Sequence, residues 1–135
     1  MSEKSEPKLL ELACEKFGEL NGAEKKLFTL AQETFSELTD SEYTLFRAIA
    51  NGKPADYRAA PEEHNNLDQA LNWGMDRTLR ADRIRWLCIE PEVWKLFLPH
   101  GIEISGAKIE GSLNLSFSEV NVPLCFLRCY FTEAL

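Results

Sequence analysis

The chain has 135 residues, of which 44% are hydrophobic and 27% are charged, and its formal net charge at pH 7 is −7. This length is typical of one domain with one apolar core and is too short for several. The acidic balance disfavours nonspecific binding to nucleic acid and to anionic membranes, because lysine and arginine recognise both.

The N-terminus and the distribution of apolar residues predict a cytoplasmic protein. No apolar run approaches the roughly 20 residues that a membrane-crossing helix needs. The segment from Met1 to Glu6 lacks the basic and apolar regions of a signal peptide. Free thiols are expected rather than a zinc site, because none of the four cysteines belongs to a C-x-x-C pair or has a histidine nearby: Cys14, Cys88, Cys125 and Cys129.

Three helices are predicted in the first half of the chain. Apolar side chains recur at helical spacing over residues 9–20 and again over residues 27–38, which indicates a helical hairpin. Thr39 and Glu42 have the spacing of a capping box, so a third helix should begin there and end at Asn51-Gly52.

A fourth helix is expected to run through Leu79, Ile84 and Leu87 to the Glu90-Pro91 break, and Pro91 can begin a fifth. The tryptophans of this region could form an aromatic docking surface, but such large side chains usually pack one layer against another, so a core role is favoured for Trp73, Trp86 and Trp94.

Four arginines on this predicted helix are a candidate for contact with phosphate or with an acidic partner surface: Arg77, Arg80, Arg83 and Arg85. Arg77 and Arg80 are the best polar candidates. Asp76 and Asp82 are interleaved at the spacing of helix-surface ion pairs, which favours a solvated or structural face.

The two histidines give no site. His64 lies beside Glu62 and Glu63, and a carboxylate-paired imidazole can act as a base or as a metal ligand. No second histidine lies near it, and a metal site needs three or four ligands, so a polar loop is the better interpretation. The same holds for His100.

The C-terminal third carries apolar residues that recur every eleven positions. Ile102 and Ile104 are two residues apart. Residues at this spacing lie on the same side of a strand but on different sides of a helix. We therefore expect short stacked strands, with glycines at their corners. The columns are Ile102, Leu113, Leu124 and Leu135; Ile104, Leu115 and Phe126; Ile109, Val120 and Phe131; and, with small residues only, Ala107, Ser118 and Cys129.

These blocks resemble the pentapeptide-repeat proteins, in a degenerate, pentapeptide-like form. The matching segments pair a small residue with a large apolar one two positions later: Ala107-Lys108-Ile109, Ser118-Glu119-Val120 and Cys129-Tyr130-Phe131. The segment from Trp73 to Asp82, running into Ile84 to Leu87, is similar to the helical lead-in of those proteins. The resemblance implies an α+β fold in which an N-terminal α-helical bundle or cap precedes the start of a right-handed quadrilateral β-helix.

Three regions follow from these patterns: an acidic helical region (1–63), a helical cap leading into the repeat (64–100) and β-helix coils (101–135). The sequence contains no nucleophile–base pair, no metal-ligand spacing and no cofactor loop, so we expect no enzyme, no catalytic residue, no cofactor and no metal. The family resemblance implies a fold and not a reaction.

A noncatalytic protein-interaction or scaffold module is the function expected. An open end of stacked strands exposes apolar side chains and unpaired backbone, so either the chain is the front of a longer repeat protein or this end docks on a second copy or a partner. The candidate interface consists of Leu124, Phe126, Phe131 and Leu135.

Two alternatives stay open. One is a nucleic-acid-binding adaptor that uses the Arg77–Arg85 helix, which the net charge disfavours. The other, implied by the family resemblance, is an acidic mimic of DNA that binds a DNA-processing enzyme, for which the strands supply only Glu103, Glu110, Glu119 and Glu133.

Overall fold

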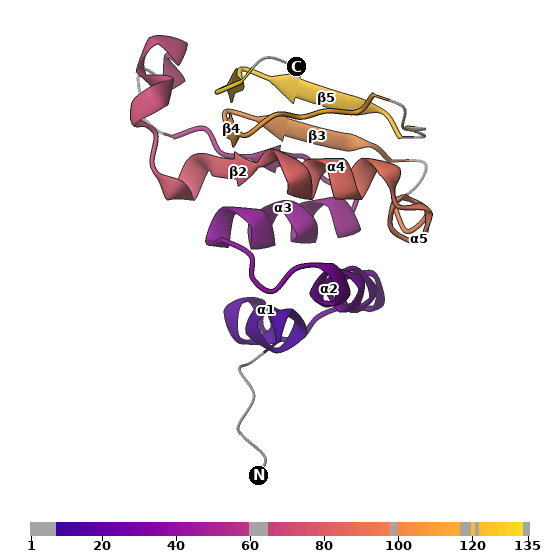
Figure 1. The fold of residues 1–135 in the computed structure, drawn as a ribbon. Helices are drawn as coiled ribbons and strands as arrows, with labels where there is room; N and C mark the ends of the chain where they lie inside the picture. Colours follow the sequence, from indigo (N-terminus) through magenta and orange to yellow (C-terminus); the bar gives the residue numbers. More distant parts are fainter. Residues whose placement is uncertain (1–7, 60–64, 98–99, 117–119, 121, 134–135) are drawn as a thin grey trace.

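The fold combines a helical part with two small sheets, and Figure 1 shows helices α1 and α2 at the opposite end of the molecule from strand β5. The structure is a computed structural model and describes residues 8–59, 65–97, 100–116, 120 and 122–133. Its elements are α1 (Leu9–Phe17), α2 (Gly22–Thr34), α3 (Asp40–Ala50), β1 (Ala55–Asp56), the 3-10 helices η2 (Leu67–Asn72) and η3 (Met75–Arg77), β2 (Thr78–Arg80), α4 (Ala81–Ile89), α5 (Pro91–Trp94), β3 (Ile102–Ser105), β4 (Lys108–Glu110), β5 (Leu124–Leu127) and β6 (Tyr130–Phe131).

The three N-terminal helices form as predicted, because their ends carry local capping signals. The side chain of Thr39 accepts a hydrogen bond from the Glu42 amide, and the Glu42 carboxylate accepts one from the Thr39 amide, so the predicted capping box of α3 is confirmed. The same reciprocal pair, Asn21 and Glu24, begins α2 several residues before the predicted start. Helix α1 ends at Phe17, before the predicted end, and Gly18 directly after it has a positive φ.

The predicted helix through Leu79 is wrong at its start. Residues Thr78–Arg80 form strand β2, in which Leu79 lies beside Ile109 of β4, and helix α4 begins only at Ala81. Pairing with a strand about thirty residues away overrides the local helical spacing here. The fifth helix begins at Pro91 as predicted.

Both sheets are parallel and have three strands, in the orders β1-β3-β5 and β2-β4-β6. Within them Ile102 lies beside Leu124, Ile104 beside Phe126, and Ile109 beside Phe131. Paired strands of the C-terminal third are therefore twenty-two residues apart, which is twice the predicted repeat. The intermediate block, which contains Leu113 and Leu115, forms no strand among its described residues. Leu113 nevertheless belongs to the apolar core, and Leu115 packs against it.

The α+β class is confirmed, but the right-handed quadrilateral β-helix is wrong. A square coil needs a strand on each of four sides in every turn, whereas these are two small open sheets that do not close into a solenoid. The first strands, β1 and β2, come from residues upstream of the repeat, and helices α4 and α5 occupy the chain between β2 and β3. The expected coils over residues 101–135 are thus replaced by two strand pairs.

One apolar core joins the helices to strands β2, β3 and β4. Its largest fully buried side chains come from both parts of the fold: Phe28, Phe46, Leu9, Leu27, Leu45, Ile49, Leu79, Ile84, Leu87, Ile102, Ile104 and Ile109. Among the described residues, no helix has both the length and the apolar character to cross a membrane.

Candidate docking site at the open end of the sheets

Arg77, one of the two best polar candidates from the sequence, is buried inside the fold. Its Nε and Nη2 atoms donate hydrogen bonds to the carbonyl oxygen of Gly106, at 2.9 and 2.7 Å. Its guanidinium carbon lies 3.6 Å from the ring centroid of Trp73, within the range of a cation–π contact. Arg77 therefore ties η3 to the turn between β3 and β4.

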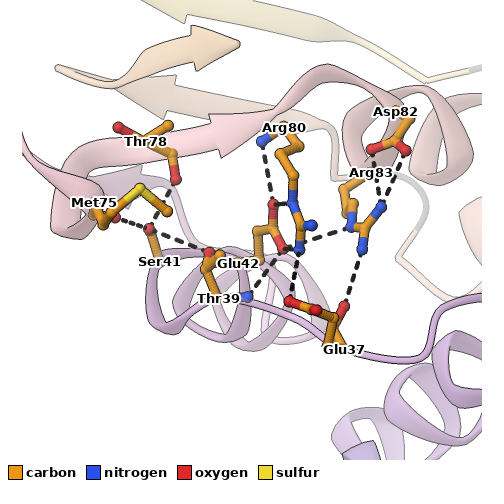
Figure 2. A network of polar contacts seen from close by, with 9 residues as sticks. All are labelled: Glu37, Thr39, Ser41, Glu42, Met75, Thr78, Arg80, Asp82 and Arg83. Atoms are coloured by element: carbon orange, nitrogen blue, oxygen red, sulfur yellow. Dashed lines mark hydrogen bonds and ion pairs between the residues drawn. The ribbon is translucent and has the colours of Figure 1, made fainter. Parts of the chain in front are cut away.

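Arg80, the other candidate, holds a buried carboxylate (Figure 2). Its Nε and Nη2 atoms donate to the two oxygens of Glu42 at 2.8 and 2.7 Å, and its backbone amide adds a third bond. The Glu42 side chain is fully buried. Burial raises the pKa of Glu42, but the hydrogen bonds from Arg80 and from the Thr39 amide outweigh it and leave the pKa below its ordinary value.

Arg83 completes this network. Its Nε atom lies 3.5 Å from Glu42, its Nη1 atom pairs with Asp82, and its Nη2 atom donates to the carbonyl oxygen of Glu37. The network joins α3, β2 and α4, which explains why the positive charge is buried there. The sequence identified Glu42 as a cap, but its second role as partner of two arginines depends on contacts that only the fold creates.

The four arginines therefore do not present one basic face. Arg77 and Arg83 are buried, Arg80 is half-buried against Glu42, and Arg85 is exposed and donates to the carbonyl oxygen of Asn114. Phosphate contact requires exposed cations in a common direction. These guanidinium groups instead bond to carbonyl and carboxylate oxygens of the protein itself.

The remaining candidates from the sequence lie apart from one another. Trp73 and Trp86 are buried and Trp94 is partly buried, as expected for packing residues. The exposed thiols are Cys14 and Cys125, while burial raises the pKa of Cys88 to about 11. No group of histidine, cysteine and carboxylate side chains among the described residues could hold a metal ion. Several residues discussed above lie outside the described part of the chain: the segment from Met1 to Glu6, Glu62, Glu63, His64, Ser118, Glu119 and Leu135.

The open end of the two sheets is formed by β5 and β6, each the last strand of its sheet. Each pairs with an inner strand on one side only, β5 with β3 and β6 with β4. In Figure 1 this end, coloured yellow, lies farthest from α1 and α2. An edge strand presents backbone N–H and C=O groups that another chain can pair with.

Apolar side chains on β5 and β6 are more exposed to solvent than the residues with which they pair on β3 and β4. Ile104 is fully buried, whereas Phe126 beside it is half-buried, and the same change separates Ile109 from Phe131. The rings of Phe126 and Phe131 meet edge to face with centroids 5.0 Å apart, which links the two sheets. Leu127 is 47% exposed.

Charge is sparse at this end. The sequence from Val120 to Glu133 contains one basic residue, Arg128, and one acidic residue, Glu133. These cancel, so the whole net charge of −7 resides elsewhere in the chain. The open end is thus a neutral, apolar surface on an acidic protein.

No known protein family, curated protein or solved structure matches this chain. The resemblance to pentapeptide-repeat proteins stays a prediction from the sequence.

Proposed function

We propose that this protein is a noncatalytic interaction module that docks through the open end of its sheets, with a second copy of the chain as the occupant. The observation that carries the proposal is the change in burial between paired strands: Ile104 and Ile109 are fully buried, and their neighbours Phe126 and Phe131 are not. A further layer on the β5 and β6 edges would remove this apolar surface from water.

Charge supports a second copy as that layer. Two chains that each carry −7 repel one another over most of their surfaces, but the open end has no net charge. The β5 and β6 edges both lie at this end, so a two-fold axis there would place these edges of one copy against those of the other. Such an isologous contact closes after two copies and leaves neither edge exposed.

The test is the oligomeric state over a wide range of protein concentrations, measured by sedimentation. We expect the wild-type chain to form dimers, and we expect Leu127→Lys to shift the dissociation constant upward by about tenfold or more, since the added charges would face one another across the axis. Leu127 is already 47% exposed, so this substitution should leave the folded monomer intact.

Met75→Lys is the matched control, because Met75 is 60% exposed but lies on η3, whose backbone bonds to Ser41 of α3 rather than to β5 or β6. It should sediment like the wild type. Labelling of the exposed Cys125 thiol gives a second readout, since dimerisation should slow its reaction with a maleimide. A wild-type chain that stays monomeric at high concentration would contradict the proposal.

A further inference from the structure

A second feature, independent of the open end, is a pocket of about 420 Å³ between α1 and the start of α3. Its lining combines two leucines, three carboxylates, one ammonium group and one phenol: Leu12, Leu38, Glu15, Glu37, Asp40, Lys16 and Tyr43. The charged side chains sum to −2, so the pocket favours a cation.

Lys16 already places a cation against this pocket. From the last turn of α1, its Nζ atom reaches Asp40 on the first turn of α3, at 2.6 Å. The same ammonium lies 5.6 Å from the ring centroid of Tyr43, within reach of a cation–π contact. Lys16 thus shows that an ammonium group can pair with Asp40 within reach of the Tyr43 ring.

The Tyr43 hydroxyl is a second, independent feature that points to a ligand. The residue is only 4% exposed, and its ring packs on Phe28 with centroids 5.7 Å apart. Its hydroxyl is buried and makes no hydrogen bond to any described residue. Burial, and secondarily the charge of Asp40, raise the pKa of Tyr43, so the hydroxyl stays protonated.

Two other carboxylates of the lining, Glu15 and Glu37, can still accept hydrogen bonds from a ligand. Glu15 is exposed and pairs with no described residue. The Glu37 side chain is 72% exposed, and its contact with Arg80 is long, at 3.9 Å. Leu12 and Leu38 add apolar walls that suit an aliphatic stem.

We propose that this pocket binds the head of an organic cation, a primary ammonium or guanidinium on a short aliphatic stem, and that Lys16 competes with it in the unliganded protein. The incoming N–H groups would bond to Asp40 and Glu15, and the Tyr43 oxygen would accept one of them once Lys16 has moved aside. The source of the cation is either a free amine or a basic side chain of a partner.

The test is an NMR titration of the full chain that follows the Tyr43 ring and the Leu12 and Leu38 methyl groups. The probes are N-acetyl-lysine methylamide, butylammonium and, as the uncharged counterpart, N-acetyl-norleucine methylamide. We expect the lysine probe to bind and the norleucine probe not to bind. Equal binding of butylammonium assigns the site to free amines, whereas preference for the lysine probe assigns it to a partner's side chain.

Three substitutions separate recognition from folding. Lys16→Met should strengthen binding of the lysine probe severalfold by removing the competitor, whereas Asp40→Asn should weaken it by about tenfold. Tyr43→Phe should weaken binding without lowering the melting temperature, since the lost hydroxyl has no partner in the free protein.

Lys25→Met is the matched control for Lys16→Met, because it removes the same charge from an exposed position on α2 outside this pocket. It should leave binding unchanged. The proposal is overturned if Lys16→Met fails to strengthen binding, or if the norleucine probe binds as well as the lysine probe. The Leu127→Lys variant should bind the probes like the wild type, so this test is independent of self-association.

Discussion

Replacing Glu42 by glutamine is expected to lower the free energy of unfolding by about 3–5 kcal/mol, because it leaves two arginines at a buried site without their counter-charge. Four hydrogen bonds end on the Glu42 carboxylate, three from Arg80 and one from the Thr39 amide. A glutamine of the same shape would turn an NH₂ group toward some of these donors. Urea unfolding at neutral pH measures the loss.

Glu24→Gln is the matched control, since Glu24 occupies the same third position of a capping box in α2 and is also buried. The side chains that bond to Glu24 can find other hydrogen-bond partners more easily than those that bond to Glu42. The Arg47 side chain is 48% exposed and can turn to water, and the Asn51 amide can rotate. We expect a loss of about 1 kcal/mol. Equal losses in the two variants would contradict a special role for the Glu42 network.

The same carboxylate sets part of the acid sensitivity. Its pKa in the folded protein lies below its ordinary value of 4.5, so the unfolded chain takes up a proton more readily than the folded chain does. The stabilisation by Glu42 is therefore complete above about pH 4.5 and is lost as the pH falls through the folded pKa. The Glu42→Gln variant should show a shallower loss of stability in acid, with the remaining slope partly due to Glu24, whose pKa is also lowered.

Replacing Gly106 by alanine is expected to cost about 2–4 kcal/mol, because a left-handed backbone and a tight environment act together. Gly106 has φ +72°, and an added Cβ would lie 2.7 Å from Cγ of Arg58, 3.0 Å from the Arg58 amide nitrogen and 3.1 Å from Nη2 of Arg77. Arg77 bonds to the Gly106 carbonyl, so any shift would also disturb its contact with Trp73. Urea unfolding gives the energy, and the Trp73 indole resonance reports the displaced arginine.

Gly111→Ala separates the two causes. Gly111 also has a positive φ, +90°, but its added Cβ would meet only the Cβ of Ala81, at an ordinary distance of 3.8 Å. The backbone penalty of about 1–2 kcal/mol should then stand alone, with no change at Trp73. A Gly111 variant as unstable as the Gly106 variant would show that crowding around Arg58 and Arg77 has little effect.

Local signals in the sequence predict the helices because their causes are local. The capping pair of Thr39 and Glu42 lies within one turn, and Pro91 fixes its own backbone at the start of α5. The spacing of two between Ile102 and Ile104 likewise identifies strands, since it depends on one segment only.

The sequence could not predict how the strands assemble, because pairing depends on distant segments. Thr78–Arg80 reads as helix locally, and only its pairing with Lys108–Glu110 makes it a strand. The eleven-residue columns predicted strands in every block, but Ile104 pairs with Phe126 and Leu115, in the block between them, lies in no strand. Periodicity gives the side that a residue faces and does not say which blocks become strands.

The candidate interface was visible in the sequence as a set of apolar positions, whereas its limits come from the fold. Phe126 and Phe131 were identified by their columns, and their partial exposure follows from being the last strands. Leu127 belongs to no column, but strand alternation places it on the side opposite Phe126, which agrees with its exposure. The pocket beside Lys16 was not predicted, because α1 and α3 bring its charges together across twenty-four residues.

The upstream origin of β1 and β2 has a consequence for the folding rate. Neither sheet can acquire its inner layer until chain segments tens of residues apart have met, since β1 joins β3 and β2 joins β4. Closing such loops loses entropy before any contact forms, which slows nonlocal pairing. The capped helices, whose contacts are short-range, are the natural nucleus, and the strands condense on them afterwards.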